Sequence, residues 1–256
     1  MKSNIGVPFF TDFSVDFDLE WQMSRAEKYC LINLLQNIKP SVAIEIGTYK
    51  GGSLQVLNKY AKEVYSLDIS KAPKQFLAPK FPKVHFKVGD SLLILPDLFI
   101  EIEKEGKKLE FILVDGDHTT KAVMRDIHSI LSYPHKNPIT IILHDSFNPQ
   151  CRAGIKGINY AQYPQVKYVE LDYITGSFWH NNTYREMWGG FAMIQFDPTN
   201  TNPASIMGSQ EQLFKRAYLS SMHLIKDRFQ FLLPLKSWLY KKLGIKHRTD
   251  MYENFD

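Results

Sequence analysis

A chain of 256 residues, 44% hydrophobic and 23% charged, is long enough for one α/β domain with appendages and has the composition of a globular protein. Its net charge of +4 gives no reason to expect a nucleic-acid partner, and no run approaches the ~18 apolar residues that a membrane span needs. The only cysteines, Cys30 and Cys151, cannot form a disulfide framework, so we expect a cytoplasmic protein.

The first predicted element is a helix over residues 24–38. Ser24 is a favoured N-cap, and apolar residues recur at helical spacing until Pro40 stops the helix. Residues 1–24 form an N-terminal segment that we treat as a candidate substrate lid.

Strands and helices then alternate along the chain. Strands are predicted over 41–47, 63–69, 83–90, 109–117 and 138–145, and helices over 51–61, 91–106 and 120–133. Such alternation implies right-handed crossovers and a mainly parallel sheet that is covered on both faces.

Two further strand-like segments, 166–174 and 189–196, have no clear helix between them and predict an antiparallel pair that finishes the sheet. The predicted fold class is therefore α/β: a doubly wound, seven-stranded, mainly parallel sheet over residues 25–197, with a C-terminal antiparallel strand pair and a helical tail.

Residues 198–256 are predicted to be a polar linker and a basic helical tail. Residues 211–248 hold nine Lys or Arg against two acids. A basic amphipathic helix either lies on an anionic membrane surface or packs on the domain or on a partner subunit. Peripheral contact with the inner membrane face and homo-oligomer formation are both left open, and we expect no nucleic acid, because no RNA-reading motif is present.

A glycine-containing loop follows the first predicted strand. The stretch AIEIGTYKGGS places Glu45, Gly47, Gly51 and Gly52 between this strand and its helix. In an open α/β sheet, ligands bind at the carboxyl ends of the strands beside the first strand, and glycine lets a ligand approach the backbone. The loop alone is equally compatible with a tight turn that binds nothing.

Polar residues also end the next two strands. Asp68 closes the second strand 21 residues after Gly47, where a carboxylate can accept hydrogen bonds from both ribose hydroxyls of a nucleoside. Asp90 and Ser91 follow the third strand, where an adenine ring would lie.

These features together resemble the class I S-adenosylmethionine-dependent methyltransferases. The segment EIGTYKGGS is similar to the corresponding motif of the cation-dependent, catechol O-methyltransferase-like group. It looks closest to the branch that contains macrolide-sugar O-methyltransferases and cephalosporin-hydroxylase-like proteins. The resemblance covers about residues 25–196 and implies a Rossmann-like fold, S-adenosylmethionine as cofactor, and a small-molecule acceptor such as a sugar hydroxyl. It implies that the cofactor is held by Glu45, Gly47, Thr48, Tyr49, Gly51, Ser53, Asp68, Asp90, Ser91 and Asp115.

Two acids and two histidines end the fourth and fifth strands. Asp115 and Asp145 close neighbouring strands, so both side chains are expected in one cleft, with His144 beside Asp145. Oxygen ligands suit Mg²⁺, and an imidazole shifts the preference towards transition metals. The resembled family binds a divalent cation with acids at these positions, which implies Asp115, His144 and Asp145 as ligands, although an acid usually stands where this chain has His144.

The resemblance also places the family's Lys or His general base at His118, with His144 as the next candidate. Other roles stay open for these residues: His118 as an exposed loop residue, His144 as a side chain that only orients Asp145, and Asp117 as a helix cap. His180 and Tyr184 are candidates for the acceptor pocket.

Two competing functions remain at this point. Asp115-Gly116-Asp117 also matches the DxD metal motif of a glycosyltransferase, although a glycine-containing turn after the first strand is not expected in glycosyltransferases. The departure at His144 leaves open a non-catalytic module that keeps only cofactor binding.

Overall fold

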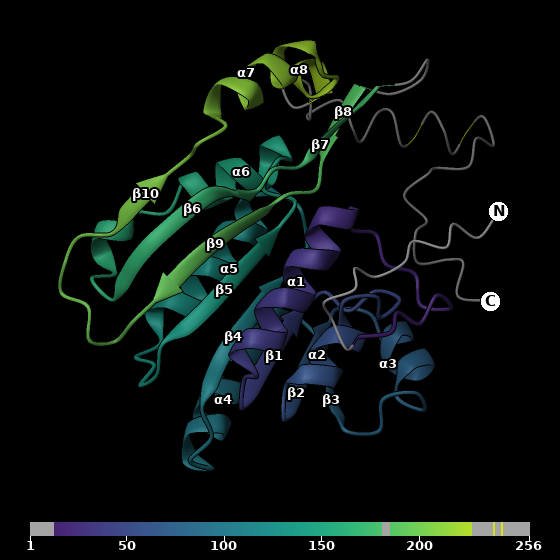
Figure 1. Ribbon diagram of the computed structural model, residues 1–256, viewed down its shortest axis with the longest axis vertical. Coiled ribbons are helices and arrows are strands. Elements are labelled where there is room, and N and C mark those ends of the chain that lie inside the picture. Colours follow the sequence, from purple (N-terminus) through teal and green to yellow (C-terminus); the bar gives the residue numbers. More distant parts are fainter. Residues whose placement is uncertain (1–12, 181–184, 227–237, 239–241, 243–256) are drawn as a thin grey trace.

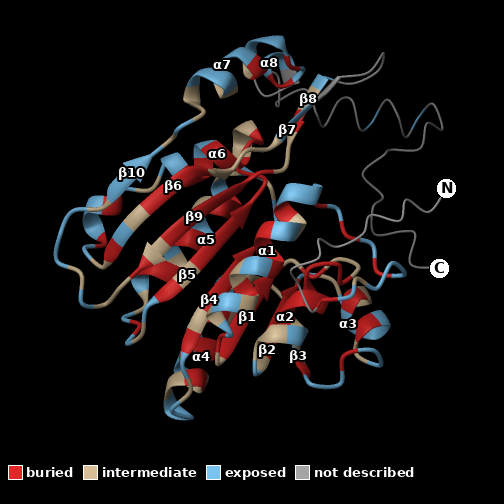
Figure 2. Ribbon diagram, viewed as in Figure 1, coloured by how far each residue is buried: buried red, intermediate tan, exposed pale blue. Residues whose placement is uncertain are grey.

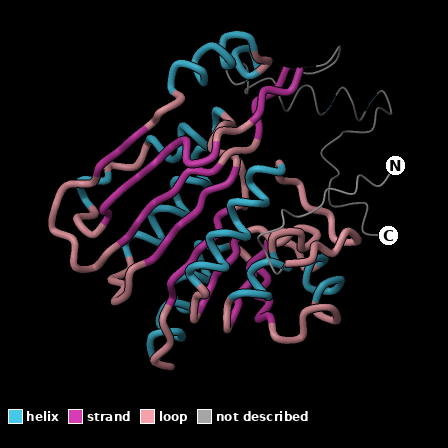
Figure 3. The backbone as a smooth tube through the Cα atoms, viewed as in Figure 1, coloured by secondary structure: helices cyan, strands magenta, loops and turns pink. Residues whose placement is uncertain are grey.

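The computed structural model describes residues 13–180, 185–226, 238 and 242. Within these ranges the main sheet has eight strands in the order β10-β6-β9-β5-β4-β1-β2-β3. Figure 1 labels these strands, and Figure 3 colours all strands magenta. The strands are β1 (Val42–Ile46), β2 (Glu63–Asp68), β3 (Val84–Val88), β4 (Leu109–Val114), β5 (Ile139–His144), β6 (Val166–Ile174), β9 (Phe191–Phe196) and β10 (Ser205–Met207).

The first five strands run parallel, and β9 is antiparallel to both β5 and β6. The predicted antiparallel pair is therefore present as β6 and β9. The predicted number of seven strands is wrong for the described part of the chain, because β10 adds an eighth strand parallel to β6. β10 comes from the segment that we predicted to be a linker, and all three of its residues are exposed.

Helices cover both faces of the sheet, which confirms the doubly wound arrangement (Figure 1). The N-terminal segment packs on one face together with α1 (Arg25–Ile38), α2 (Leu54–Tyr60) and α3 (Ala72–Leu77). The other face is covered by α4 (Ser91–Lys104), α5 (Thr120–Ser132) and α6 (Pro149–Lys156). Figure 2 shows that burial is concentrated in the strands and in the helix faces turned towards them.

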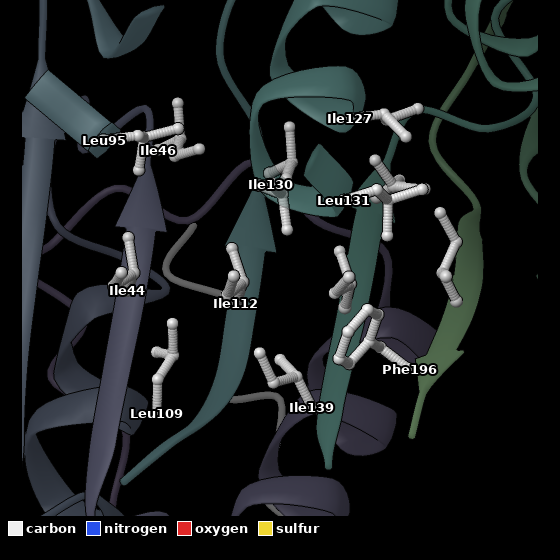
Figure 4. Packing of buried hydrophobic residues seen from close by; sticks show 14 of the residues in the cluster. Ile44, Ile46, Leu95, Leu109, Ile112, Ile127, Ile130, Leu131, Ile139 and Phe196 are labelled. Atoms are coloured by element: carbon white, nitrogen blue, oxygen red, sulfur yellow. The ribbon is translucent and has the colours of Figure 1, made fainter. Parts of the chain in front are cut away.

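Alternation along β1 explains how one strand serves both faces. Ile44 and Ile46 point into the layer of α4 and α5, where Leu95 lies beside Ile46, as Figure 4 shows. Ala43 points to the opposite layer. All five residues of β1 are buried, as expected for a central parallel strand.

The switch point of the sheet lies between β1 and β4. The chain proceeds from β1 to β2 and β3 in one direction and then returns to place β4 on the other side of β1. The loops that follow β1 and β4 are therefore adjacent, and the amide of Asp115 donates to the carbonyl of Ile46 at 2.7 Å. Such a position is the usual ligand-binding place of an open α/β sheet.

Several short elements follow β5. A 3₁₀ turn (Tyr160–Gln162) precedes β6, and a separate hairpin of β7 (Ser177–His180) and β8 (Arg185–Trp188) follows it. Of the predicted basic tail, α7 (Glu211–Ser220) and α8 (His223–Lys226) are described, and most of the remainder lies outside the described residues. Within the described ranges, no helix is long and apolar enough to cross a membrane.

Arg152 attaches α7 to the sheet. Its guanidinium is 2% exposed and contacts Asp172 on β6 through two hydrogen bonds of 2.8 and 3.1 Å, and it also donates to Glu211 at 2.9 Å. The ring of Phe214 lies 4.5 Å from the guanidinium carbon. The buried cation is thus paired with two carboxylates and an aromatic face, while its Nε has no hydrogen-bond partner among the described residues.

Candidate active site

The loop after β1 touches the loop after β4. Gly47 has φ +92°, and a Cβ added there would lie 1.9 Å from the carbonyl oxygen of Asp115. Gly51 also has positive φ, at +80°. Glycine at position 47 is therefore required both by backbone conformation and by the close approach of Asp115.

Asp68 shapes this loop through its carboxylate. Oδ2 accepts hydrogen bonds from the amides of Thr48 and Tyr49, at 3.1 and 3.2 Å, and Oδ1 accepts one from the amide of Ser70 at 2.8 Å. An ionised carboxylate offers about four lone pairs. These three bonds leave room for about one ligand hydroxyl, where the sequence suggested two.

Glu45 lies inside the protein beneath the same loop. Its carboxylate is fully buried and accepts hydrogen bonds from Ser53 Oγ at 2.6 Å and Ser66 Oγ at 2.8 Å. Burial raises the pKa of Glu45 to about 8, although both serines oppose the shift. Glu45 and Ser53 are thus bonded to each other and support the loop from the interior.

Asp90 and Ser91 have structural partners at the end of β3. Asp90 is the N-cap of α4 and accepts a hydrogen bond from the amide of Leu92 at 3.0 Å. Ser91 Oγ donates to Asp126 Oδ1 at 2.6 Å, and burial raises the pKa of Asp126. Both residues stand at the strand end where the resemblance places the adenine ring.

The N-terminal segment lies against the glycine-containing loop. A Cβ on Gly52 would fall 2.4 Å from Cβ of Trp21, so the loop and the segment are in direct contact. Glu20 forms an ion pair with Lys50 at 2.7 Å and accepts a hydrogen bond from the hydroxyl of Tyr49 at 3.3 Å. The described part of the segment therefore covers one side of the loop.

The predicted acids and histidines come together at the ends of β4 and β5. Nδ1 of His144 lies 2.8 Å from Oδ1 of Asp115 and 3.7 Å from Oδ2 of Asp145. One ligand atom from each of these three residues lies within 4.8 Å of the others, a spacing that suits a metal ion. The sequence therefore identified a real cluster, formed from two adjacent strands.

His118 joins this cluster rather than pointing into solvent. Its Nε2 lies 3.1 Å from Oδ2 of Asp145 and 3.7 Å from Oδ1 of Asp115. That nitrogen is buried and forms no hydrogen bond with either carboxylate. The ring of Trp188 packs edge-on against the His118 ring at 5.6 Å between centroids. By contrast, Asp117 is exposed and accepts a bond from the amide of Thr119, and Thr119, not Asp117, caps α5.

Glu27 is a member of the cluster that the sequence reading missed. Oε1 of Glu27 lies 3.1 Å from Nε2 of His144 and accepts a hydrogen bond of 2.5 Å from the amide of Gly190. The only signal in the sequence was the capping box that Glu27 forms with Ser24 at the start of α1. That pattern accounts for the glutamate locally and says nothing of a partner 117 residues away.

Asp145 is held in an unusual backbone conformation beside the cluster. Its φ is +56°, and its Oδ1 accepts a hydrogen bond of 2.5 Å from the amide of Gly189. The amides of Ser146 and Phe147 donate to the carbonyls of Gly190 and Gly189. A left-handed residue that is not glycine, fixed by several bonds, is typical of a functional site.

The charges of the cluster reinforce one another. Burial lowers the pKa of His144, but the charges of Asp115 and Asp145 outweigh burial and raise it well above its usual value. Burial likewise opposes ionisation of Asp115, yet the charges of both histidines hold its pKa well below its usual range. The pKa of His118 is raised by the same two acids against burial. The carboxylates thus attract positive charge to this point.

A surface hollow of about 530 Å³ lies elsewhere, at the opposite end of β5. It is lined by Pro138, Lys167, Tyr168, Gln195, Phe196, Asp197 and Ser205. None of the predicted site residues that the structure describes borders it, and ligands of open α/β sheets bind at the carboxyl ends of the strands. Tyr184 and the side chain of His180, the candidates for the acceptor pocket, lie outside the described part of the chain.

The strand order and the loops at the switch point belong to a fold that is similar to that of a solved O-methyltransferase. Residues 44–147 match a family model described as a methyltransferase domain. No curated protein matches the chain in sequence.

Two solved structures show what the fold is similar to. An O-methyltransferase from Bacillus cereus, in complex with SAH, is 19% identical, with 70% of this chain and 85% of that chain covered and a TM-score of 0.51. The O-methyltransferase TomG from Streptomyces achromogenes, in complex with SAM, is 14% identical, with 70% and 82% covered and a TM-score of 0.47. At 19% identity the likeness to the Bacillus cereus protein is one of fold.

Proposed function

We propose that the protein is an S-adenosylmethionine-dependent O-methyltransferase that acts on a hydroxyl of a sugar or another small metabolite. The observation that carries the proposal is the direct contact between Gly47 and the carbonyl of Asp115. This contact places the loop expected to hold the methyl donor beside the acid cluster expected to hold the acceptor. Methyl transfer needs the two held together, since the reaction is an in-line displacement whose rate depends on orientation.

The cofactor residues divide into two groups in this proposal. Gly47, Thr48, Tyr49 and Gly51 would let the ligand lie close to the loop, whose amides at Thr48 and Tyr49 are bonded to Asp68, and Asp68 would offer its remaining lone pair to the ribose. Glu45 and Ser53 act indirectly by holding the loop, while Asp90 and Ser91 fix the start of α4 beside the adenine position.

The donor set of the cluster fits a divalent cation. It offers carboxylate oxygens from Asp115 and Asp145 and an imidazole nitrogen from His144 within 4.8 Å of one another. When bound, the cation would lower the pKa of an acceptor hydroxyl. The two aspartates and His144 would position that hydroxyl, and Trp188 beside His118 would form part of the wall around it.

His118 is the proposed general base. Its buried Nε2 faces the cluster and lacks a directed hydrogen-bond partner, so it is placed to accept a proton from a hydroxyl held there. The two aspartates raise the pKa of His118 in the cation-free protein. The imidazole is therefore available as a base once the charge of these acids is neutralised.

The position of Asp117 argues against the glycosyltransferase alternative. A DxD site needs both acids at one cation, whereas Asp117 is exposed and bonded to the amide of Thr119. The proposal also divides the chain into a lid (1–24), a methyltransferase domain (25–197) and a linker with a basic tail (198–256). It includes a cytoplasmic location and contact of the tail with a membrane or with a second copy of the chain. The lid role is supported by the packing of Trp21 on Gly52.

Calorimetry with S-adenosylhomocysteine tests the core of the proposal. We expect micromolar binding, about 8 kcal/mol, by the wild-type protein. Asp68→Ala should weaken binding by about 1–3 kcal/mol, because a charge-assisted bond to the ribose and the support of the loop are both lost. Asp97→Ala, which removes an exposed acid of α4, is the control and should bind normally. A wild-type protein that gives no heat of binding, or an unchanged constant in Asp68→Ala, contradicts the proposal.

A further inference from the structure

Glu27 is a buried carboxylate whose hydrogen-bonding capacity is used at the cluster. Its side chain is 2% exposed. Oε1 meets Nε2 of His144 at 3.1 Å and the amide of Gly190 at 2.5 Å, while Oε2 accepts a bond of 2.5 Å from the amide of Ser24. A buried acid with three donors around it is fixed in orientation, so it can in turn fix the ring of His144.

The position of Glu27 determines which nitrogen of His144 faces the two aspartates. In the cation-free structure both ring nitrogens of His144 face a carboxylate, Nδ1 facing Asp115 at 2.8 Å and Nε2 facing Glu27 at 3.1 Å. A cation at the cluster would replace the proton on Nδ1, while Glu27 would keep the proton on Nε2. Nδ1 is then the nitrogen turned towards Asp115 and Asp145. The same arrangement of carboxylate, histidine and metal recurs in metal sites, where the outer acid fixes the tautomer and raises the basicity of the ligand.

We infer that Glu27 is a positioning residue that makes His144 a nitrogen ligand, and that the site therefore selects a late first-row transition metal, such as Zn²⁺ or Co²⁺, over Mg²⁺. The inference rests on the proposed function in that it takes the cluster to be the cation site. Mg²⁺ prefers oxygen ligands in octahedral geometry and keeps several waters. A buried imidazole suits Zn²⁺ and Co²⁺ instead, and carboxylates from Asp115 and Asp145 complete a mixed N/O donor set.

The experiment is metal binding by the full-length protein, followed without turnover. Zn²⁺, Co²⁺ and Mg²⁺ are titrated separately into wild type and Glu27→Gln, and the visible absorption of bound Co²⁺ reports its ligands. We expect Zn²⁺ and Co²⁺ to bind wild type more tightly than Mg²⁺. Glu27→Gln should bind Zn²⁺ about 10- to 100-fold more weakly and shift the Co²⁺ bands, because a neutral amide no longer holds His144 as the carboxylate does.

Ser24→Ala is the matched control, since it removes the side-chain half of the capping box and leaves the carboxylate of Glu27 beside His144. It should destabilise α1 and leave the Zn²⁺ affinity and the Co²⁺ spectrum unchanged. Equal affinity of wild type for Mg²⁺ and Zn²⁺, unchanged binding in Glu27→Gln, or an equal loss in both variants overturns the inference. S-adenosylhomocysteine binding is measured in parallel. If it persists while Zn²⁺ does not bind, the inference fails alone, and if it is absent from wild type, the proposed function fails.

Discussion

Replacing Gly47 by alanine should disturb both the stability of the fold and the acid cluster. At φ +92° an alanine is strained by about 1–2 kcal/mol, as L-residues are in left-handed conformations. Its Cβ would also lie 1.9 Å from the carbonyl oxygen of Asp115, and both groups are part of the backbone. Neither side can rotate away, so the loops after β1 and β4 must separate. Forced overpacking of this kind costs about 1–3 kcal/mol or more.

Gly106→Ala isolates the overlap from the strain. Gly106 has φ +67°, and a Cβ there would meet nothing within 4 Å. The control therefore carries the backbone strain alone. This strain is partly offset by about 0.4–1 kcal/mol, because alanine restricts the unfolded chain more than glycine does. The difference between the two variants should be about 1–3 kcal/mol, which lowers the melting temperature of Gly47→Ala by about 2–12 °C relative to Gly106→Ala.

Differential scanning calorimetry measures this difference, and a Zn²⁺ titration shows whether Asp115 has moved. We expect weaker Zn²⁺ binding in Gly47→Ala only. Equal melting temperatures in the two variants would mean that the loops separate without cost and that the contact between Gly47 and Asp115 does not hold the site together.

Two further predictions concern buried charges. The pKa of Glu45 is about 8 in the folded protein and near 4.5 when unfolded, so the folded state binds an extra proton between these values and wild type should lose stability as pH rises from about 5 to 8. Glu45→Gln removes this loss, so the melting temperature of the variant should rise relative to that of wild type as pH increases. A difference in melting temperature that is the same at pH 5 and pH 8 contradicts the assignment. Arg152→Met leaves the buried carboxylate of Asp172 without its guanidinium partner and should cost about 3–5 kcal/mol in urea unfolding. Lys156→Met, which removes an exposed partner of Glu211, should stay within about 0.5 kcal/mol of wild type, and similar losses in both variants would refute the distinction.

The parts of the fold that follow from local chemistry were predictable. The helix after Ser24 begins at Arg25 because of its cap, and the alternating strands and helices gave the parallel sheet and its two faces. Asp115 and Asp145 could be placed together because parallel strands end at one edge. These inferences need only periodicity, caps and the direction of the strands.

The parts that depend on long-range contacts were not predictable. β10 is three exposed residues in a polar segment and has no alternation that marks a strand. Glu27 looks like a capping residue, and its second role depends on β5 and on Gly190, which no spacing in the sequence connects to α1. Asp68 was expected to serve a ligand, yet most of its lone pairs serve the loop itself, because the exact path of a loop decides which amides a carboxylate meets.

The position of β9 has a consequence for the order in which the chain can fold. β9 is made after β6 but lies between β5 and β6, so β5 presents an unpaired, apolar edge until residue 196 has been synthesised. An open edge of this kind is exposed to pairing with other chains. Gly189 and Gly190, which hold Asp145 and Glu27, arrive with the same strand. Closure of the sheet therefore coincides with completion of the acid cluster, and a nascent chain gains the site only when the open edge of β5 is paired.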